Sequence, residues 1–181
     1  MKYFAYVPLF ASVALGHSIF QDLWVGSTDD ATKYTRLPLS NSPVTNVQSA
    51  DMRCNTGTKP VAGTASVAAG GTLTVEMHAQ PNDRNCNTEA IGGQHYGPVL
   101  IYMSKVADAT TDTGAGQWFK VAQDGYDPAV GTASWGTEKL NANCGKKTFT
   151  GKLLQHRPIN YLLIEMCSPQ KSAIRRLPRA R

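Results

Sequence analysis

The sequence lacks several features that would place it in a common class of protein. It has no Cys-x-x-Cys pair, no internal repeat, no low-complexity linker and no Asn-x-Ser/Thr glycosylation acceptor. The missing Cys-x-x-Cys spacing argues against a zinc knuckle, and the missing 3.6-residue periodicity argues against a mainly helical chain. What remains is a chain of 181 residues, which is long enough for one domain with a buried core.

Positive charge is plentiful, but it is concentrated at one end of the chain. The whole sequence has a formal net charge of +5, yet five basic residues lie within its last eleven positions. Residues 17–170 hold 12 basic and 13 acidic residues, a balance of −1. The basic character therefore belongs to a C-terminal tail, 166–181, that we expect to be disordered, and nucleic-acid binding is not predicted for the domain.

The first sixteen residues have the pattern of a secretory signal peptide. Lys2 precedes an apolar stretch from Phe4 to Leu15, and small residues at positions 14 and 16 form a cleavage site. The stretch is too short to span a membrane, so no membrane association is predicted. A buried N-terminal strand is the alternative interpretation. Cleavage after Gly16 makes His17 the first residue of a secreted, extracellular protein, whose domain we place at residues 17–165.

The remaining pattern is one of short strands separated by turn residues. Thr72–His78 alternates between apolar and polar residues, as expected for a half-buried strand. Polar loops are predicted at residues 26–34 and 79–94. Further strands are predicted at residues 17–25, 60–69, 99–103, 117–121, 135–140 and 161–164. Many short strands with Gly and Pro turns predict an all-β protein built as a β-sandwich.

Four cysteines in a chain that is expected to be secreted predict two disulfides. Four cysteines allow three connectivities, and the sequence spacing alone does not select one of them. The four are Cys54, Cys86, Cys144 and Cys167.

Two histidines have a pattern that predicts a metal site. His95 lies in the glycine-bracketed stretch Gly92–Pro98, which runs directly into an apolar strand. If His17 is the first residue, its α-amine and ring Nδ1 can chelate a metal together, and a second imidazole completes a three-nitrogen site. Nitrogen ligands in a planar arrangement suit Cu(II). The alternative for His95 is a turn histidine packed on Tyr96, and His78 is predicted to be structural.

An ordered set of short motifs resembles the fungal lytic polysaccharide monooxygenases of auxiliary activity family 9, formerly glycoside hydrolase family 61. The resemblance covers residues 17 to about 147, and its most specific motif is Glu89–Val99, EAIGGQHYGPV. The other matching stretches are His17, Arg36–Pro38, Asn41–Val44, Asp51–Asn55, Thr72–His78, Asn82–Cys86, Tyr102–Val106, Trp118–Val121, Trp135–Thr137 and Asn143–Lys146.

The resemblance implies both a fold and an activity. The fold is an immunoglobulin-like or fibronectin-III-like β-sandwich with long loops. The site is one copper ion held by the amine and Nδ1 of His17 and the Nε2 of His95, both of which would be catalytic. With an external electron donor and O2 or H2O2, it would oxidise cellulose or a related β-glucan beside the glycosidic bond. A glycoside hydrolase would instead need two facing carboxylates, and the singly scattered acidic residues offer no such pair.

Other residue roles are also implied. Tyr34 and Tyr96 are candidates for stacking on sugar rings, although half-buried tyrosines are common in any domain. The resemblance implies a Cys86–Cys144 disulfide, because both cysteines lie in matching motifs. We expect a monomer. Trp24, Trp118 and Trp135 are predicted to be core residues rather than glycan platforms.

The chain departs from the family pattern after residue 147. The family's last strand carries a Gln-x-Tyr or Gln-x-Phe element and a cysteine, and its tyrosine lies axial to copper. Here the pattern returns only at Tyr161–Leu163, and neither the axial tyrosine nor its supporting glutamine and histidine is found. Such supporting partners commonly contribute tens-fold to metal affinity or activity. A non-catalytic copper- or glycan-binding sandwich is therefore the alternative function, and a disulfide-held structural or effector-like protein is a third.

Overall fold

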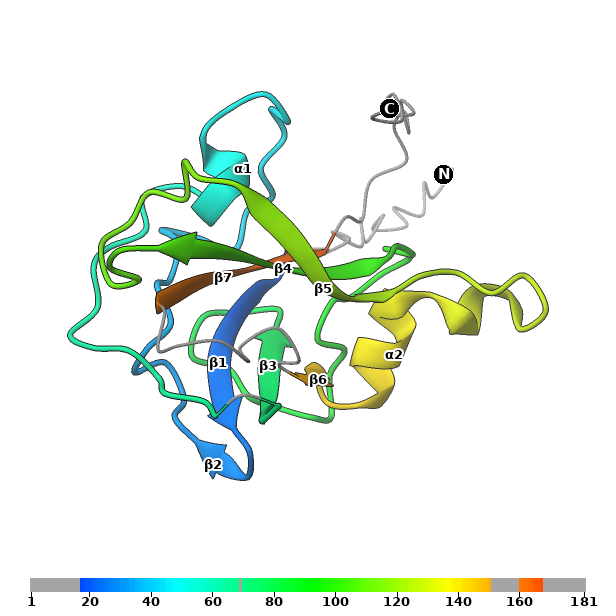
Figure 1. Ribbon diagram of the computed structural model, residues 1–181. Helices are drawn as coiled ribbons and strands as arrows, with labels where there is room; N and C mark the ends of the chain where they lie inside the picture. The colour runs from blue at the N-terminus through cyan, green and yellow to red at the C-terminus, as the bar shows by residue number, and fades with distance from the viewer. Residues whose placement is uncertain (1–16, 69, 151–159, 168–181) are drawn as a thin grey trace, which may run out of the picture.

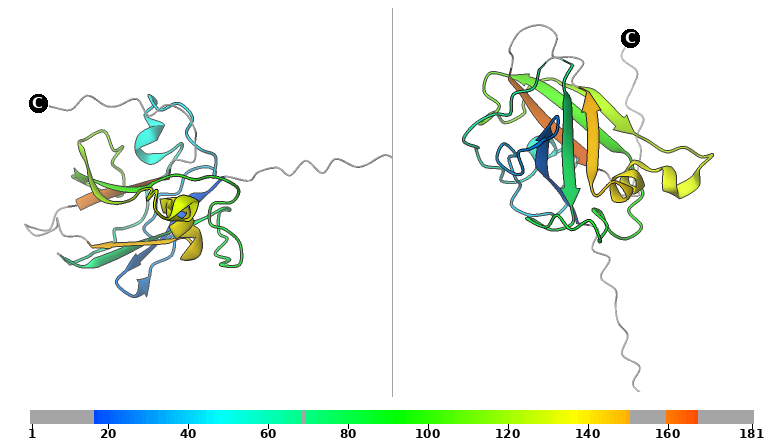
Figure 2. Two further views of the ribbon diagram at one scale, coloured as in Figure 1. Left: turned by 90° about the vertical axis from the view of Figure 1, so that its right-hand side faces the viewer. Right: turned by 90° about the horizontal axis from the view of Figure 1, so that it is seen from below.

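The computed structural model describes residues 17–68, 70–150 and 160–167, which form two facing β-sheets. One sheet has the strand order β2-β1-β3-β6 and the other the order β5-β4-β7. The two sheets lie in separate layers, as the side view in Figure 2 shows. The prediction of an all-β sandwich is confirmed.

The first sheet is antiparallel throughout and is centred on β3. Its strands are β1 (Ile19–Val25), β2 (Thr28–Asp29), β3 (Thr72–His78) and β6 (Lys146–Thr150). β1 pairs with β3 from Ile19↔His78 to Val25↔Leu73, with an irregularity between Phe20 and Asp22. On its other side, β3 pairs with β6 in the register Glu76↔Lys146.

The second sheet is centred on β4. β4 (Val99–Val106) lies between β5 (Trp118–Asp124) and β7 (Asn160–Cys167), and both pairings are antiparallel. β4 begins four residues after His95, so the start of this central strand fixes the position of the loop that carries the histidine. In Figure 1, β4 runs beneath β5 and alongside β7.

The hydrophobic core lies between the two sheets. β3 contributes Leu73, Val75 and Met77, which are two residues apart and therefore share one face of the strand. Val99 and Ile101 contribute from β4 in the same alternating way. The other buried members are Phe20, Ala90, Ile91, Leu140 and Phe149, which come from β1, the loop before His95, α2 and β6.

Two short helices and one 3-10 turn complete the described part of the chain. They are α1 (Asp51–Cys54), η1 (Gly131–Ser134) and α2 (Gly136–Ala142). Figure 1 places α1 above the second sheet and α2 beside the end of β5. Neither helix of the described segments approaches the length and hydropathy that crossing a bilayer would require.

The strand predicted at 135–140 is wrong, because this stretch forms most of α2. Trp135 and Thr137 favour a strand by propensity, but the run Glu138–Leu140 consists of good helix formers. Burial of Leu140 in the core stabilises the helix, and the amide of Gly145 donates to the carbonyl of Leu140 as the chain reverses.

Two other strand predictions need correction, and two strands were not predicted. Residues 60–68 form no strand, and residue 69 lies outside the described residues. β2 and β6 were not predicted, since β2 has only two residues and β6 begins with two lysines. β3 has the predicted bounds, but it is buried on both faces from Leu73 to His78 rather than half-buried. Its outer face is covered by side chains from neighbouring strands and from the loop that follows it.

We expect Gly145→Ala to destabilise the protein by more than about 2 kcal/mol. Gly145 has a φ of 75°, and a Cβ there would lie 3.0 Å from the carbonyl carbon of Met77, with the carbonyl oxygen nearer still. Gly125→Ala is the matched control, because a Cβ at Gly125 meets nothing within 4 Å. Urea unfolding of both variants tests this, and equal midpoints would contradict it.

Candidate metal centre

The backbone around His95 forms a tight turn that fixes the direction of the ring. Gly93 has a φ of 72°, a conformation that glycine adopts readily, and the amide of His95 donates to the carbonyl of Gly93 at 2.9 Å. The ring Nδ1 lies 2.6 Å from the carbonyl oxygen of Gly92. A carbonyl can only accept, so Nδ1 carries the proton and donates. In the neutral ring Nε2 therefore keeps its lone pair, which is the form that ligates a metal.

Both ends of the His95 loop, residues 91–97, are hydrogen-bonded to α2. The amide of Ile91 donates to Oδ1 of Asn141 at 3.0 Å, and Nδ2 of Asn141 donates to the carbonyl of Ile91 at 3.1 Å. The amide of Gly97 donates to Oγ1 of Thr137 at 3.1 Å, and the amide of Thr137 donates to the carbonyl of Gly97 at 3.1 Å. The loop is thus held by two reciprocal pairs of hydrogen bonds.

His17 lies two residues before β1 and is half-buried. No hydrogen bond or ion pair joins it to another described residue. β1 and β4 belong to different sheets, so His17 and His95 precede strands in opposite layers of the sandwich. Their joint ligation of a metal belongs to the proposal below.

The two candidate sugar-stacking tyrosines differ in exposure. Tyr96 directly follows His95 and is 39% exposed. Tyr34 is half-buried, and the Lys33 Nζ lies 4.7 Å from the centre of its ring. A Cβ at Gly63 would lie 3.5 Å from the Tyr34 ring, so the backbone there also covers it. Tyr96 is therefore the more available of the two for a ligand.

Cys86 and Cys144 form a disulfide with a Cα–Cα distance of 4.9 Å. It joins the loop that follows β3 to the residue that precedes Gly145 and β6. Cys54 is a free thiol among the described side chains, and burial raises its pKa. The side chain of Cys167 and the proposed tail at 166–181 lie outside the described side chains.

A buried charge network on the outer face of β3 was missed by the sequence reasoning. Glu76 is 2% exposed and receives hydrogen bonds from the Arg84 guanidinium at 2.5 and 3.0 Å. His78 bonds the same carboxylate at 2.8 Å, and Nε1 of Trp24 does so at 2.7 Å. Burial alone would raise the pKa of Glu76, but these hydrogen bonds outweigh burial and lower it to about 2.

Arg84 also neutralises two aspartates of the first sheet. Its Nη1 lies 2.7 Å from Asp29, and its Nε lies 3.3 Å from the buried Asp22. Burial raises the pKa of Asp22, and the Arg84 cation opposes that rise. The Oδ2 of Asp22 has no hydrogen-bond partner among the described atoms. The sequence pattern places positions 22 and 24 on one face of β1 and positions 76 and 78 on one face of β3, but alternation alone assigns that face of β3 to solvent.

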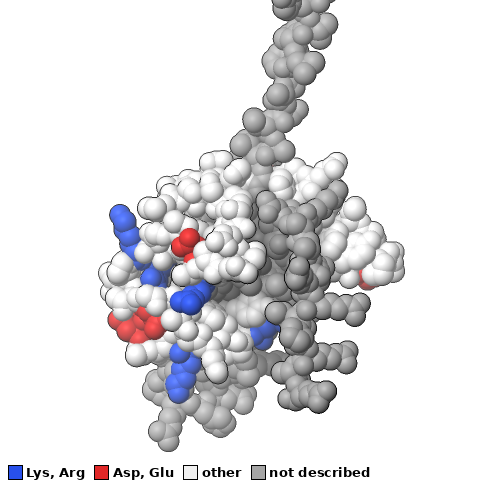
Figure 3. Space-filling model, turned by 90° about the horizontal axis from the view of Figure 1, so that it is seen from above, with Lys and Arg blue, Asp and Glu red and all other residues white. Residues whose placement is uncertain are grey.

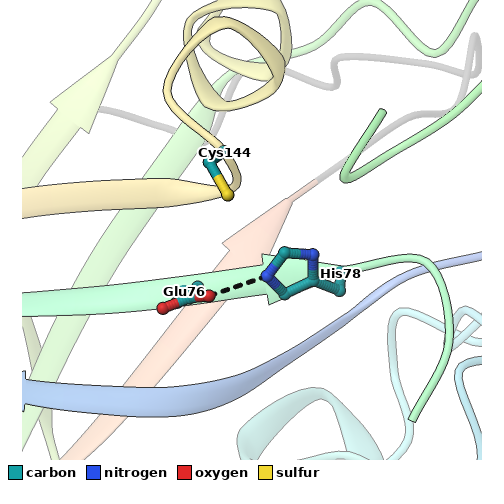
Figure 4. A group of neighbouring side chains, drawn as sticks. All are labelled: Glu76, His78 and Cys144. Atoms are coloured by element: carbon teal, nitrogen blue, oxygen red, sulfur yellow. Dashed lines mark hydrogen bonds and ion pairs between the residues drawn. The ribbon is translucent and has the colours of Figure 1, made fainter. Parts of the chain in front are cut away.

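Glu76, His78 and Cys144 are a second cluster of potential metal ligands. Their ligand atoms all lie within 4.8 Å of one another, and Figure 4 shows the His78 ring directed at Glu76 with Cys144 across from both. However, the Cys144 sulfur is bonded to Cys86, and Glu76 is already paired with the Arg84 cation. Neither group is available to a metal in this arrangement, so the cluster is structural. His78 is therefore buried and hydrogen-bonded, as a structural histidine should be.

The surface charge is mixed on the face that Figure 3 shows. Lys and Arg side chains lie among Asp and Glu side chains there, and the described atoms form no large region of one sign.

The chain belongs to Auxiliary Activity family 9 (formerly GH61), whose family model matches residues 17–162. A relative from Botryotinia fuckeliana, AA9 family lytic polysaccharide monooxygenase E, is 57% identical over 135 residues, which are 74% of this chain and 55% of that protein. AA9-X282 from Trametes coccinea, also named an AA9 family lytic polysaccharide monooxygenase, is 56% identical over 142 residues, which are 78% of this chain and 51% of that protein. The chain spans about half the length of the curated relatives it matches.

Solved structures support the same fold. The structure called CvAA9A superposes with a TM-score of 0.70 at 31% identity, over 82% of this chain and 64% of that one. Cel61B from Hypocrea jecorina, a glycoside hydrolase family 61 member, gives a TM-score of 0.58 at 17% identity, over 81% of this chain and 69% of that one. The architecture is the immunoglobulin-like β-sandwich of this family.

We expect acid to remove the stabilisation that the Glu76 network provides. The folded pKa of Glu76 is about 2 and its ordinary value is 4.5, so its contribution is present above pH 4.5 and is lost as the pH falls towards 2. The advantage of the wild type over Glu76→Gln should therefore shrink by about 2–3 kcal/mol between pH 7 and pH 2.5. Urea unfolding at both pH values measures it.

Glu89→Gln is the control for this experiment, because Glu89 is an exposed glutamate outside the network. Its stability relative to the wild type should change little with pH. A Glu76→Gln variant that loses no more stability at pH 7 than at pH 2.5 would contradict the assigned role of Glu76.

Proposed function

We propose that this protein is a secreted, copper-dependent lytic polysaccharide monooxygenase that acts on cellulose or a related β-1,4-glucan. Membership of the family and its relatives' printed names support the polysaccharide monooxygenase class. The observation that carries the copper assignment is the His95 ring. Its Nδ1 is committed to the Gly92 carbonyl, which leaves Nε2 as a free nitrogen ligand.

The residues present fit a copper ion. In the proposed site the α-amine and Nδ1 of His17 and the Nε2 of His95 supply three nitrogens, a donor set that suits Cu(II). Copper would supply electron transfer from an external donor to O2 or H2O2, and with it the capacity to oxidise a C–H bond. The Gly92 carbonyl holds the His95 ring by its second nitrogen, as a metal-binding histidine requires.

The proposed binding of a polysaccharide substrate depends on Tyr96. It is exposed, it follows His95 directly, and an aromatic ring can stack on a sugar face. Tyr34 is a second candidate with a ring that is partly covered. We propose that the protein acts as an extracellular monomer, with a polysaccharide as its partner.

Copper binding should require a free amine on His17. A chain that begins at His17 should bind Cu(II) with 1:1 stoichiometry, whereas one that keeps Gly16 should bind at least about tenfold more weakly, because the amine becomes an amide and the chelate opens. Isothermal titration calorimetry measures both. His95→Ala should weaken binding similarly, and His156→Ala serves as the histidine control. Equal affinity for all four proteins would rule out this site.

Turnover separates the enzyme from a copper- or glycan-binding protein. We expect weak formation of oxidised oligosaccharides from amorphous cellulose with ascorbate, because residues after Lys147 do not carry the family's Gln-x-Tyr element. A version with a family-like C-terminal strand should give more product, as measured by mass spectrometry. His95→Ala is the inactive control. Absence of oxidised products from both versions would favour the binding protein.

A further inference from the structure

One side of α2 and a cysteine two residues beyond its end contact the chain before β4 at three points. Thr137 and Asn141 are four residues apart, a spacing that places both side chains on one side of the helix, and Cys144 follows the helix with a φ of 51°. Their partners are Gly97, Ile91 and Cys86, in the opposite order along the chain. The helix and residues 86–97 therefore lie antiparallel and are joined at three points.

The contact at Thr137 lies in the protein interior, whereas Asn141 is half-buried. Thr137 is 0% exposed, and the amide of Gly97 donates to it within the protein interior. Gly136 allows the close approach, because a Cβ there would lie 2.5 Å from the amide nitrogen of Val99 and 2.6 Å from the carbonyl of Asp124. Leu140, between the two hydrogen-bonding positions, packs in the hydrophobic core. The helix is thus fixed to the sandwich and in turn fixes the loop.

From this arrangement we infer that Thr137 and Asn141 are positioning residues for the imidazole of His95. They touch neither metal nor substrate. They hold the loop at Ile91 and Gly97, which lie four residues before and two residues after His95. The Gly92 carbonyl, which accepts the hydrogen bond from Nδ1, is adjacent to Ile91, so the anchor at Asn141 also places the acceptor that orients the ring. The inference rests on the proposed function, in which His95 ligates copper.

The direction of the His95 ring is then set before any metal binds. Loss of either anchor should leave the copper ligands in place but allow the ring to turn. Thr137→Val has nearly the same shape and removes the oxygen that accepts from Gly97, whereas Thr137→Ser retains a hydroxyl. Asn141→Ala removes both hydrogen bonds to Ile91.

The decisive measurement is the electron paramagnetic resonance spectrum of the Cu(II)-loaded chain that begins at His17, with copper affinity measured in parallel. Thr137→Val and Asn141→Ala should each change the copper hyperfine splitting and weaken affinity about tenfold. Thr137→Ser should restore the wild-type spectrum. Thr74→Val is the matched control, because Thr74 is buried in β3 and bonds the hydroxyl of Thr148, away from the loop.

A second measurement needs no copper. In the metal-free protein, amide hydrogen exchange at Gly97 should speed up in Thr137→Val, and exchange at Ile91 should speed up in Asn141→Ala, with Thr74→Val unchanged at both. If one variant fails to fold, the other still tests the inference through its own anchor.

The possible failures are distinguishable. If His95→Ala leaves the copper spectrum and affinity of the wild type unchanged, the proposed copper site is wrong and the inference falls with it. If His95→Ala abolishes the site but Thr137→Val and Asn141→Ala both retain the wild-type spectrum and affinity, only the positioning role is wrong. Altered spectra that Thr137→Ser does not restore would also overturn it.

Discussion

The buried carboxylate of Glu76 is the constraint on which the rest of the described structure depends. β3 lies at the centre of its sheet and is covered on both faces, so a carboxylate on its outer face is taken out of water. A buried charge without partners is strongly unfavourable, and a partner must therefore be supplied. Arg84 supplies it from the loop that follows β3, while His78 and Trp24 satisfy the remaining acceptor positions.

Neutralising Glu76 has a consequence for the chain that leads to His95. Arg84 begins that stretch, and the Cys86 disulfide, the Asn141 pair and the Thr137 pair follow in order along it. The buried side chain of Gln21 adds two hydrogen bonds to the carbonyls of Gln80 and Asp83 and one from the amide of Asn82. A long loop without regular secondary structure is thereby fixed at intervals of a few residues, and the histidine that we propose as a copper ligand lies near its end.

The sequence alone was sufficient to predict the strands whose hydrophobic pattern is strong. The alternation in Thr72–His78 and the apolar run at Val99 located the central strands of the two sheets, because burial of their inner faces dominates their pattern. The sequence alone was insufficient where contacts between distant residues determine whether a segment forms a helix or a strand. α2 has a weak helical signal and depends on Leu140 entering the core, and β6 depends on pairing with β3. The burial of Glu76 and His78 could not be predicted from alternation, since alternation assigns those positions to solvent.

For the site, the sequence identified His95 by its glycine-bracketed loop, and the structure adds the reason that the ring has one usable nitrogen. The contacts that place this ring come from β1, β3 and α2, with the disulfide just beyond α2, all between residues 21 and 144. None of these contacts involves a residue after Lys147. The imidazole half of the proposed copper site is thus held by contacts within residues 21–144, inside the stretch 17–162 that the family model matches. The orientation of His95 can therefore be tested separately from any contribution that residues after Lys147 make to the proposed copper site.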